Sequence, residues 1–197
     1  MTELCLIRHG ETEWNLKGLT QGSTDIPLNE LGREQARLTG AHLTGERWDA
    51  LYASDLSRAR ETAAIIGGEV GLPAPVTDAR LRERGFGEAE GLGVDVRKSR
   101  YTDSSSIPGA EPWAQVSERG IEALEEIVRK HDGRRLIVVS HGGLIISVLG
   151  RLSDGVLGPG RPLLRNLSMT LITFNGSWEI PWYNRVAPEL EDEAVSA

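Results

Sequence analysis

Leu4-Cys5-Leu6-Ile7-Arg8-His9-Gly10 is an apolar run that ends abruptly in two basic side chains and a glycine. Such short runs are typical of strands that are buried on both faces of a parallel sheet. A second run, over residues 136–139, ends in Ser140-His141-Gly142-Gly143, and a weaker third run over residues 50–53 ends in Ser54-Asp55. The sequence therefore predicts several parallel strands with polar residues just past their ends.

Helical patterns lie between and after these runs. Ser54 or Asp55 would cap a helix whose apolar side chains share one face, namely Ala59, Ala63, Ile66 and Val70. Asn29 would cap an earlier helix with Leu31, Leu38 and Ala41. Residues 117–130 and 144–152 are predicted as helices and 167–174 as a further strand. Strands that alternate with helices predict an α/β fold, a three-layer α/β/α sandwich around a mostly parallel sheet.

The chain has 197 residues, and its pattern favours one domain over residues 1–188. No internal repeat or linker divides it. Residues 85–112 are rich in glycine, serine and polar side chains, and we expect an irregular loop excursion near the site over residues 92–112. Residues 189–197 are acidic and are expected to form a disordered tail.

Composition limits the partners and the compartment. The formal net charge of −7 argues against nucleic acid as a partner, because binding to a phosphate backbone requires a basic face. A single cysteine, Cys5, excludes an intrachain disulfide and favours a reducing compartment, so we expect a cytoplasmic protein. No apolar stretch reaches membrane-spanning length and no signal peptide is recognisable, so no membrane association is expected.

The predicted strand ends point to a binding site. In open α/β sheets, ligands bind outside the carboxyl ends of the strands. Arg8 and His9 follow one strand, His141 follows another, and Arg58 lies on the first helical turn after the third. These four side chains are therefore expected to meet at one edge of the sheet. His42 and His131 follow no apolar strand, and we interpret them as structural or surface residues.

The residue types at this edge suit phosphoryl transfer. Arginine side chains bind phosphate oxygens with forked donors, and their charge depresses the pKa of nearby imidazoles. A neutral imidazole can attack phosphorus, and the departing alkoxide then needs a proton from a carboxylic acid. Candidate acids are Glu83, Glu88 and Glu90. Zinc binding by His9, His141 and a carboxylate is a weaker alternative, because no local ligand pair exists and the arginines would repel a cation.

Further motifs follow in a fixed order along the first three quarters of the chain. They are Leu6-Ile7-Arg8-His9-Gly10-Glu11-Thr12-Glu13-Trp14-Asn15, Gln21-Gly22, Asp25-Ile26-Pro27-Leu28-Asn29-Glu30-Leu31-Gly32, Gln35-Ala36, Ser54-Asp55-Leu56-Ser57-Arg58-Ala59-Arg60-Glu61-Thr62-Ala63, Leu81-Arg82-Glu83, Gly87, Glu90-Gly91, Val139-Ser140-His141-Gly142-Gly143 and Asn166. This ordered set resembles the histidine phosphatase superfamily, in its phosphoglycerate mutase-like branch. One such motif alone would be a weak indication, but the ordered set is very specific.

The resemblance implies roles for individual residues. It identifies His9 as the residue that becomes phosphorylated and Glu83 as the proton donor, in preference to Glu88 and Glu90. Catalytic roles also fall to Arg8, Arg58 and His141. The residues that would bind phosphate or substrate are Arg8, Asn15, Gln21, Gly22, Arg58, His141 and Gly142. No metal and no cofactor is implied.

The predicted function is a metal-independent phosphomonoesterase that hydrolyses a small phosphorylated metabolite through a phosphohistidine. The mutases of the resembled branch carry a longer, basic and aromatic insertion after the position of Gly91, and the shorter stretch here should admit water. A mutase, a phosphoprotein phosphatase and a catalytically silent binding module on the same fold are the alternatives. The aromatic run over residues 178–183 would suit an interface, so both a monomer and a homodimer stay open.

Overall fold

The computed structural model describes residues 1–159 and 164–191. Six strands form one sheet in the order β3-β2-β4-β1-β5-β6. Their bounds are β1 (Thr2–Arg8), β2 (Ala50–Ala53), β3 (Val76–Thr77), β4 (Arg135–Ser140), β5 (Met169–Phe174) and β6 (Trp178–Arg185). Strands β1 to β4 pair in parallel, whereas β5 runs antiparallel to β1 and β6 antiparallel to β5. The predicted mostly parallel sheet is confirmed.

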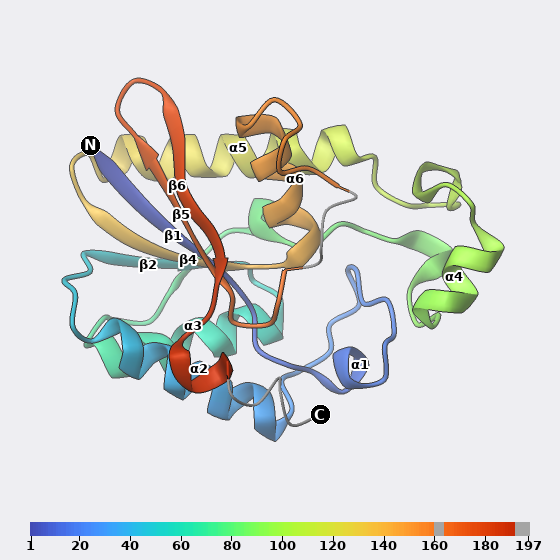
Figure 1. Ribbon diagram of the computed structural model, residues 1–197, viewed down its shortest axis with the longest axis horizontal. Helices are drawn as coiled ribbons and strands as arrows, with labels where there is room; N and C mark the ends of the chain where they lie inside the picture. The colour runs from blue at the N-terminus through green and yellow to red at the C-terminus, as the bar shows by residue number, and fades with distance from the viewer. Residues whose placement is uncertain (160–163, 192–197) are drawn as a thin grey trace.

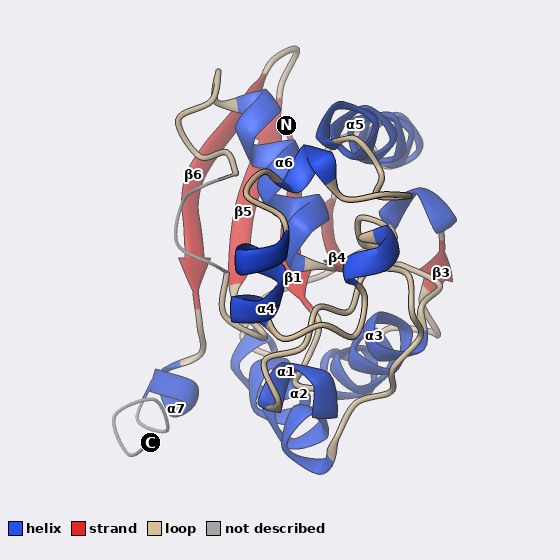
Figure 2. Cartoon of the chain, turned by 90° about the vertical axis from the view of Figure 1, so that its right-hand side faces the viewer, coloured by secondary structure: helices blue, strands red, loops and turns tan. Residues whose placement is uncertain are grey.

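Helices cover both faces of this sheet, which makes three layers (Figures 1 and 2). The helices are α1 (Glu13–Leu16), α2 (Glu30–Leu43), α3 (Ser57–Val70), α4 (Val94–Arg100), α5 (Trp113–Lys130), α6 (Gly142–Leu152) and α7 (Pro188–Glu191). Helices α2 and α3 pack on one face of the sheet, and α5 and α6 pack on the other. Helix α4 stands apart at one end of the molecule, beyond the ends of β1 and β4 (Figure 1).

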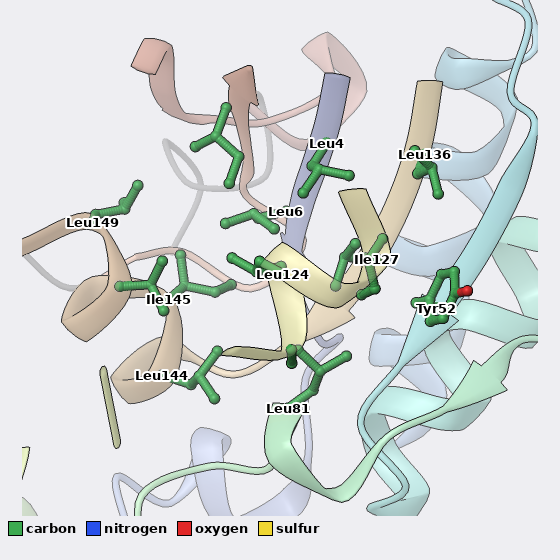
Figure 3. Close-up of a cluster of buried hydrophobic side chains, with 14 of the residues drawn as sticks. Leu4, Leu6, Tyr52, Leu81, Leu124, Ile127, Leu136, Leu144, Ile145 and Leu149 are labelled. Carbon is green, nitrogen blue, oxygen red and sulfur yellow. The ribbon is translucent and has the colours of Figure 1, made fainter. Parts of the chain in front are cut away.

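Alternation along the central strands divides the core into two. Leu4 and Leu6 of β1 face the layer of α5 and α6, while Cys5 and Ile7 face the layer of α2 and α3. Strand β4 repeats this alternation beside it, because the two strands pair in register. Figure 3 shows the first core, in which Leu6 meets side chains of α5 and α6. Both faces of the central strands are apolar, so the continuous apolar runs of the sequence are explained.

Two helix caps show where local sequence reasoning succeeds and fails. The Asn29 side chain accepts a hydrogen bond from the Gly32 backbone and caps α2, as predicted. The prediction that Ser54 or Asp55 caps α3 is wrong, because Leu56 holds the cap position without a side-chain hydrogen bond. Asp25 supplies the missing acceptor from a distant loop, through the Ser57 backbone N–H at 2.8 Å. No local pattern reveals such a partner.

The predicted inner face of α2 is also partly wrong. Leu31 and Ala41 are exposed, whereas small residues, namely Gly32, Ala36, Thr39 and Gly40, form most of the buried face. Small side chains let α2 approach α3 and the first loop closely. Hydrophobicity alone therefore selects the wrong stripe.

Two strands were not predicted. β3 is only two residues long, and β6 lies over the aromatic run that suggested an interface. In β6, half-buried and exposed residues alternate: Trp178 and Ile180 pack on one core, and Trp182 packs on the other across a β-bulge. The aromatic run thus contributes to the edge of the sheet. Whether the protein is a homodimer stays a prediction.

The loop predictions need correction in part. The excursion over residues 92–112 is not irregular throughout, because it contains α4 and a turn of 3-10 helix over Ser104–Ser106. The first residues of the predicted tail form α7 with Leu190 buried, while residues 192–197 lie outside the described residues. None of the helices over residues 1–159 and 164–191 combines the length and hydrophobicity needed to span a bilayer.

Candidate active site

The ends of β1 and β4 bring two histidines together. Arg8 and Ser140 are the last residues of these neighbouring strands and face each other in the sheet. The backbone N–H of His9 donates to the carbonyl oxygen of Ser140 at 2.9 Å, and the ring centroids of His9 and His141 lie 5.1 Å apart. The sequence prediction that these rings meet at one sheet edge is therefore met by the geometry.

A hydrogen bond fixes the orientation of the His9 ring. Nδ1 of His9 lies 2.7 Å from the carbonyl oxygen of Gly10. A carbonyl oxygen only accepts, so Nδ1 carries the proton and Nε2 keeps a free lone pair. Burial lowers the pKa of His9 well below its usual value, and the positive charges of Arg58 and Arg8 lower it further. The ring is therefore neutral and oriented at neutral pH, and such an imidazole can act as a nucleophile.

His141 has a similar electrostatic environment. It is fully buried at the N-cap position of α6, and neither ring nitrogen has a hydrogen-bond partner among the described residues. Burial, followed by the charge of Arg58, lowers its pKa well below the usual value. The first turn of α6 starts at Gly142, so the positive end of the α6 helix dipole lies next to His141.

Arg58 is held by the loop that contains Gly22. It is completely buried on the first turn of α3, and its two terminal nitrogens donate to the carbonyl oxygens of Gly22 at 2.8 Å and Thr24 at 2.9 Å. Its Nε has no partner among the described residues. A buried guanidinium with a free donor is suited to bind an anion.

Glu90 organises that loop. Its carboxylate accepts hydrogen bonds from the backbone N–H groups of Ser23, Thr24 and Phe86, at 2.8, 2.8 and 3.0 Å, and from the Thr24 hydroxyl. Gly22 has a φ of +63°, and a β-carbon there would lie 2.1 Å from a carboxylate oxygen of Glu90. Only glycine fits this position. Both carboxylate oxygens of Glu90 thus accept hydrogen bonds that stabilise the loop around Arg58.

Asn15, Gln21, Arg8 and Asn166 complete the surroundings of His9. Asn166 donates from Nδ2 to the carbonyl oxygen of His9 at 2.8 Å and lies 3.4 Å from Oδ1 of Asn15. Arg8 donates from Nη1 to the carbonyl oxygen of Leu164, and its Nε has no partner in the described part of the chain. Oε1 of buried Gln21 is likewise unpartnered there.

Glu83 binds the start of α6. Its carboxylate accepts hydrogen bonds from the backbone N–H groups of Gly143 at 3.0 Å, Leu144 at 3.1 Å and Arg84 at 2.8 Å. Gly143 follows His141 by two residues, so the Glu83 carboxylate is held at the same end of α6 as His141. Glu88, by contrast, is exposed, and its carboxylate accepts a hydrogen bond from the Tyr101 hydroxyl at 3.4 Å. Of the three candidate acids, Glu83 has the placement that suits proton transfer.

The arrangement forms a cluster of donors around the neutral imidazole of His9. Nε of Arg8, Nε of Arg58 and the ring of His141 are unpartnered in residues 1–159 and 164–191, beside the free Nε2 of His9. Such a set suits a phosphate dianion rather than a metal ion. No cluster of three or more His, Cys, Asp or Glu side chains that would hold a metal occurs in those residues.

Two contributions were missed by the sequence reasoning. Asp25 belongs to a motif that we recognised but received no role, although it supports the first turn of α3 and therefore Arg58. Gly10 has a structural role that its motif does not reveal, since a β-carbon at this position would lie 2.5 Å from the carbonyl oxygen of Gly32. The signals available in the sequence were the charge of Asp25 and the small size of Gly10, since both residues lie inside recognised motifs.

Comparison with known proteins fits this geometry. A family model described as the histidine phosphatase superfamily (branch 1) matches residues 4–185. The chain belongs to the histidine phosphatase superfamily. The predicted family is therefore confirmed, and the enzyme is a phosphatase that acts on phosphate monoesters.

Individual members of the superfamily are similar over most of the chain. A Bacillus subtilis protein named uncharacterized phosphatase PhoE is 37% identical over 93% of this chain and 95% of its own. A metal-independent phosphoserine phosphatase from Arabidopsis thaliana is 38% identical over 78% of this chain and 70% of its own. The solved structure of Bacillus stearothermophilus YhfR has a TM-score of 0.86 at 31% identity and covers 94% of this chain and 98% of its own.

Proposed function

We propose that this phosphatase transfers the phosphoryl group of a small phosphate monoester to Nε2 of His9 and then to water. The observation that carries the proposal is the orientation of the His9 ring. Its Nδ1 proton is directed to the Gly10 carbonyl oxygen, so the nitrogen with the lone pair faces the other way. The low pKa of this imidazole keeps that lone pair available.

Arg8, Arg58 and His141 are the proposed phosphate-binding residues. Their unpartnered donors would bind the three non-bridging oxygens, whose charge must be neutralised while phosphorus moves between the two nucleophiles. Asn15, Gln21, Gly22 and the backbone at Gly142 would line the same site. His141 would donate from one ring nitrogen, since burial and Arg58 keep it neutral.

Each step can be written with its bonds. Nε2 of His9 attacks phosphorus, the bond between phosphorus and the ester oxygen breaks, and the carboxylic acid of Glu83 gives its proton to the departing oxygen. Water then attacks the phosphohistidine while the Glu83 carboxylate accepts the proton of that water. The phosphorus–nitrogen bond breaks, which releases inorganic phosphate and restores neutral His9.

The substrate class is a small phosphorylated metabolite. The Arabidopsis relative named for phosphoserine supports a compact ester, and the short segment after Gly91, which contains α4, should admit water. A mutase would return the phosphoryl group to a bound product instead. A phosphoprotein phosphatase would use the same chemistry on a larger substrate.

Trapping of the phosphoenzyme tests the proposal. Brief reaction with a radiolabelled phosphate ester followed by alkaline quench should leave acid-labile label on the wild type and none on His9→Ala. Turnover by His9→Ala should fall on the order of 10³-fold or more. His42→Ala is a matched control, since His42 is exposed on α2. Label retained by His9→Ala would contradict the assignment of the nucleophile.

Product analysis separates the alternatives. With 3-phosphoglycerate, hydrolysis predicts free phosphate, whereas interconversion with 2-phosphoglycerate without phosphate release would identify a mutase. A panel of phosphopeptides would detect the phosphoprotein alternative. The same assays with a chelator should give unchanged rates, since the proposed steps use no metal.

A further inference from the structure

Arg119 of α5 makes an unusual set of contacts with the segment that carries Glu83. Nη1 donates to the carbonyl oxygens of Arg80 and Arg82, both at 2.7 Å, and Nη2 donates to the carbonyl oxygen of Glu83 at 3.1 Å. Nε and Nη2 also bind the two carboxylate oxygens of Glu111, at 2.7 and 2.9 Å. All three nitrogens of the guanidinium are therefore engaged.

Glu111 extends this contact to the residues after Glu83. Its backbone N–H donates to the carbonyl oxygen of Gly85 at 2.8 Å, and its carboxylate accepts from the Gly85 N–H at 3.2 Å. Its carbonyl oxygen accepts from Nε of Arg84 at 2.7 Å. Arg119 thus holds the backbone up to Glu83, and Glu111 holds the backbone immediately after it.

The Glu83 side chain is fixed from another direction. The first turn of α6 donates two backbone hydrogen bonds to its carboxylate, while Arg119 of α5 binds its carbonyl oxygen and Glu111 binds the backbone of Gly85. A carboxyl held at both its backbone and its oxygens has little freedom to move. Proton transfer needs such restriction, because a small displacement of the acid lengthens the path of the proton.

We propose that Arg119 and Glu111 are positioning residues for the Glu83 carboxyl, which they hold at the distance from which it protonates the leaving oxygen. The pair is half-buried, with 19% and 23% of the side chains exposed, so water competes weakly for these hydrogen bonds. Within residues 1–159 and 164–191, neither side chain hydrogen-bonds to Arg58 or to the rings of His9 and His141, although the charge of Arg119 is a minor cause of the low pKa of His141. The inference rests on the proposed acid role of Glu83, and it predicts a defect confined to leaving-group protonation.

Two aryl phosphates of similar size test whether the defect is confined to protonation of the leaving group. p-Nitrophenyl phosphate releases a weakly basic phenolate that needs little protonation, whereas phenyl phosphate releases a far more basic one. Arg119→Met should lower kcat/KM for phenyl phosphate by about 10-fold to 100-fold and for p-nitrophenyl phosphate by about threefold at most. Glu111→Gln should show the same preference to a smaller degree. Retained hydrolysis of p-nitrophenyl phosphate would itself show that the variants fold.

Arg80→Met is the matched control. The Arg80 side chain also joins this segment to α5, through Asp78 and Glu126, but it makes no contact with the backbone of Glu83 or Gly85. Arg80→Met should lower kcat/KM for both aryl phosphates to the same extent, or for neither. If Arg119→Met behaves like this control, or slows both substrates to the same extent, Arg119 has only a structural role and the proposal is wrong.

Comparison with Glu83→Gln separates this inference from the proposed function. Glu83→Gln should show the leaving-group preference most strongly, and adding Arg119→Met to it should cause no further loss on phenyl phosphate. A selective defect in Glu83→Gln alone would overturn the inference and leave the acid assignment intact. A Glu83→Gln variant without any preference would overturn the acid role itself. Should Arg119→Met fail to fold, Arg119→Lys and Glu111→Gln decide the question by the same ratio of rates.

Discussion

The rings of His9 and His141 lie 5.1 Å apart, and neither can take up a proton without burying a charge beside Arg58. Burial is the largest cause of the low pKa of both imidazoles, and the arginine charges act in the same direction. The pair is thus neutral where an isolated histidine would be partly charged. Two consequences can be measured.

The first concerns the ring of His9. Long-range proton–nitrogen NMR should show the tautomer with hydrogen on Nδ1, and the ring should stay neutral as the pH falls from 8 through 6.5. Arg58→Met should raise the pKa of His9 toward its usual value, because one of the two positive charges is removed. A wild-type His9 that titrates at its usual value would contradict this account of the nucleophile.

The second concerns stability. Below the usual pKa of histidine the unfolded chain binds protons at residues 9 and 141, whereas the folded protein does not. The free energy of unfolding must therefore fall as the pH is lowered through 6.5, with each site contributing at most about 1.4 kcal/mol per pH unit. Urea unfolding at pH 7.5 and 5.5 measures this slope. His9→Gln should make the slope shallower, and an unchanged slope would show that His9 does not contribute.

Glu90 gives a prediction about phosphate binding. Glutamine at this position cannot accept all four hydrogen bonds of the loop, so the loop should hold Arg58 less firmly. We expect Glu90→Gln to weaken inhibition by inorganic phosphate about 10-fold, as for loss of a charge-assisted hydrogen bond. Glu88→Gln is the control, because Glu88 is exposed. Equal phosphate affinity in the two variants would exclude this role of Glu90.

Two helical glycines should respond in opposite directions to the same substitution. A β-carbon at Gly32 would lie 2.1 Å from the backbone carbonyl oxygen of Glu11, so Gly32→Ala should cost roughly 1–3 kcal/mol of stability. Gly68 of α3 has open space around it, and Gly68→Ala should add about 0.5–1 kcal/mol, because alanine favours helix. Thermal unfolding compares them. A stable Gly32→Ala would mean that α2 moves away from the first loop readily.

The sequence predicts the parts of this molecule that depend on local pattern. Runs of apolar residues on β1 and β4 reveal the centre of the sheet, because these strands are buried on both faces. The strand ends then indicate where Arg8, His9 and His141 meet. The proton donor cannot be identified in this way. The residues alone leave Glu83, Glu88 and Glu90 as candidates, and only the family resemblance favours Glu83.

Contacts between distant segments cannot be predicted from the sequence pattern. Asp25 caps α3 from a separate loop, and Arg119 reaches the carbonyl oxygens around Glu83 from another helix. These bonds have no periodicity and no fixed spacing. The short strand β3 and the bulged strand β6 were missed because their pairing partners, rather than their own side chains, define them. The predicted roles of the site residues stay predictions until the variants are measured.

The position of β4 has a consequence for how the protein is made. β4 lies between β2 and β1, so the first 130 residues contain β1 and β2 without the strand that joins them. During synthesis on the ribosome, the nascent chain must wait for residues 135–140 before the middle of the sheet can close. His9 gains its backbone partner, Ser140, only at that point. A product truncated earlier should therefore be both inactive and exposed to proteolysis.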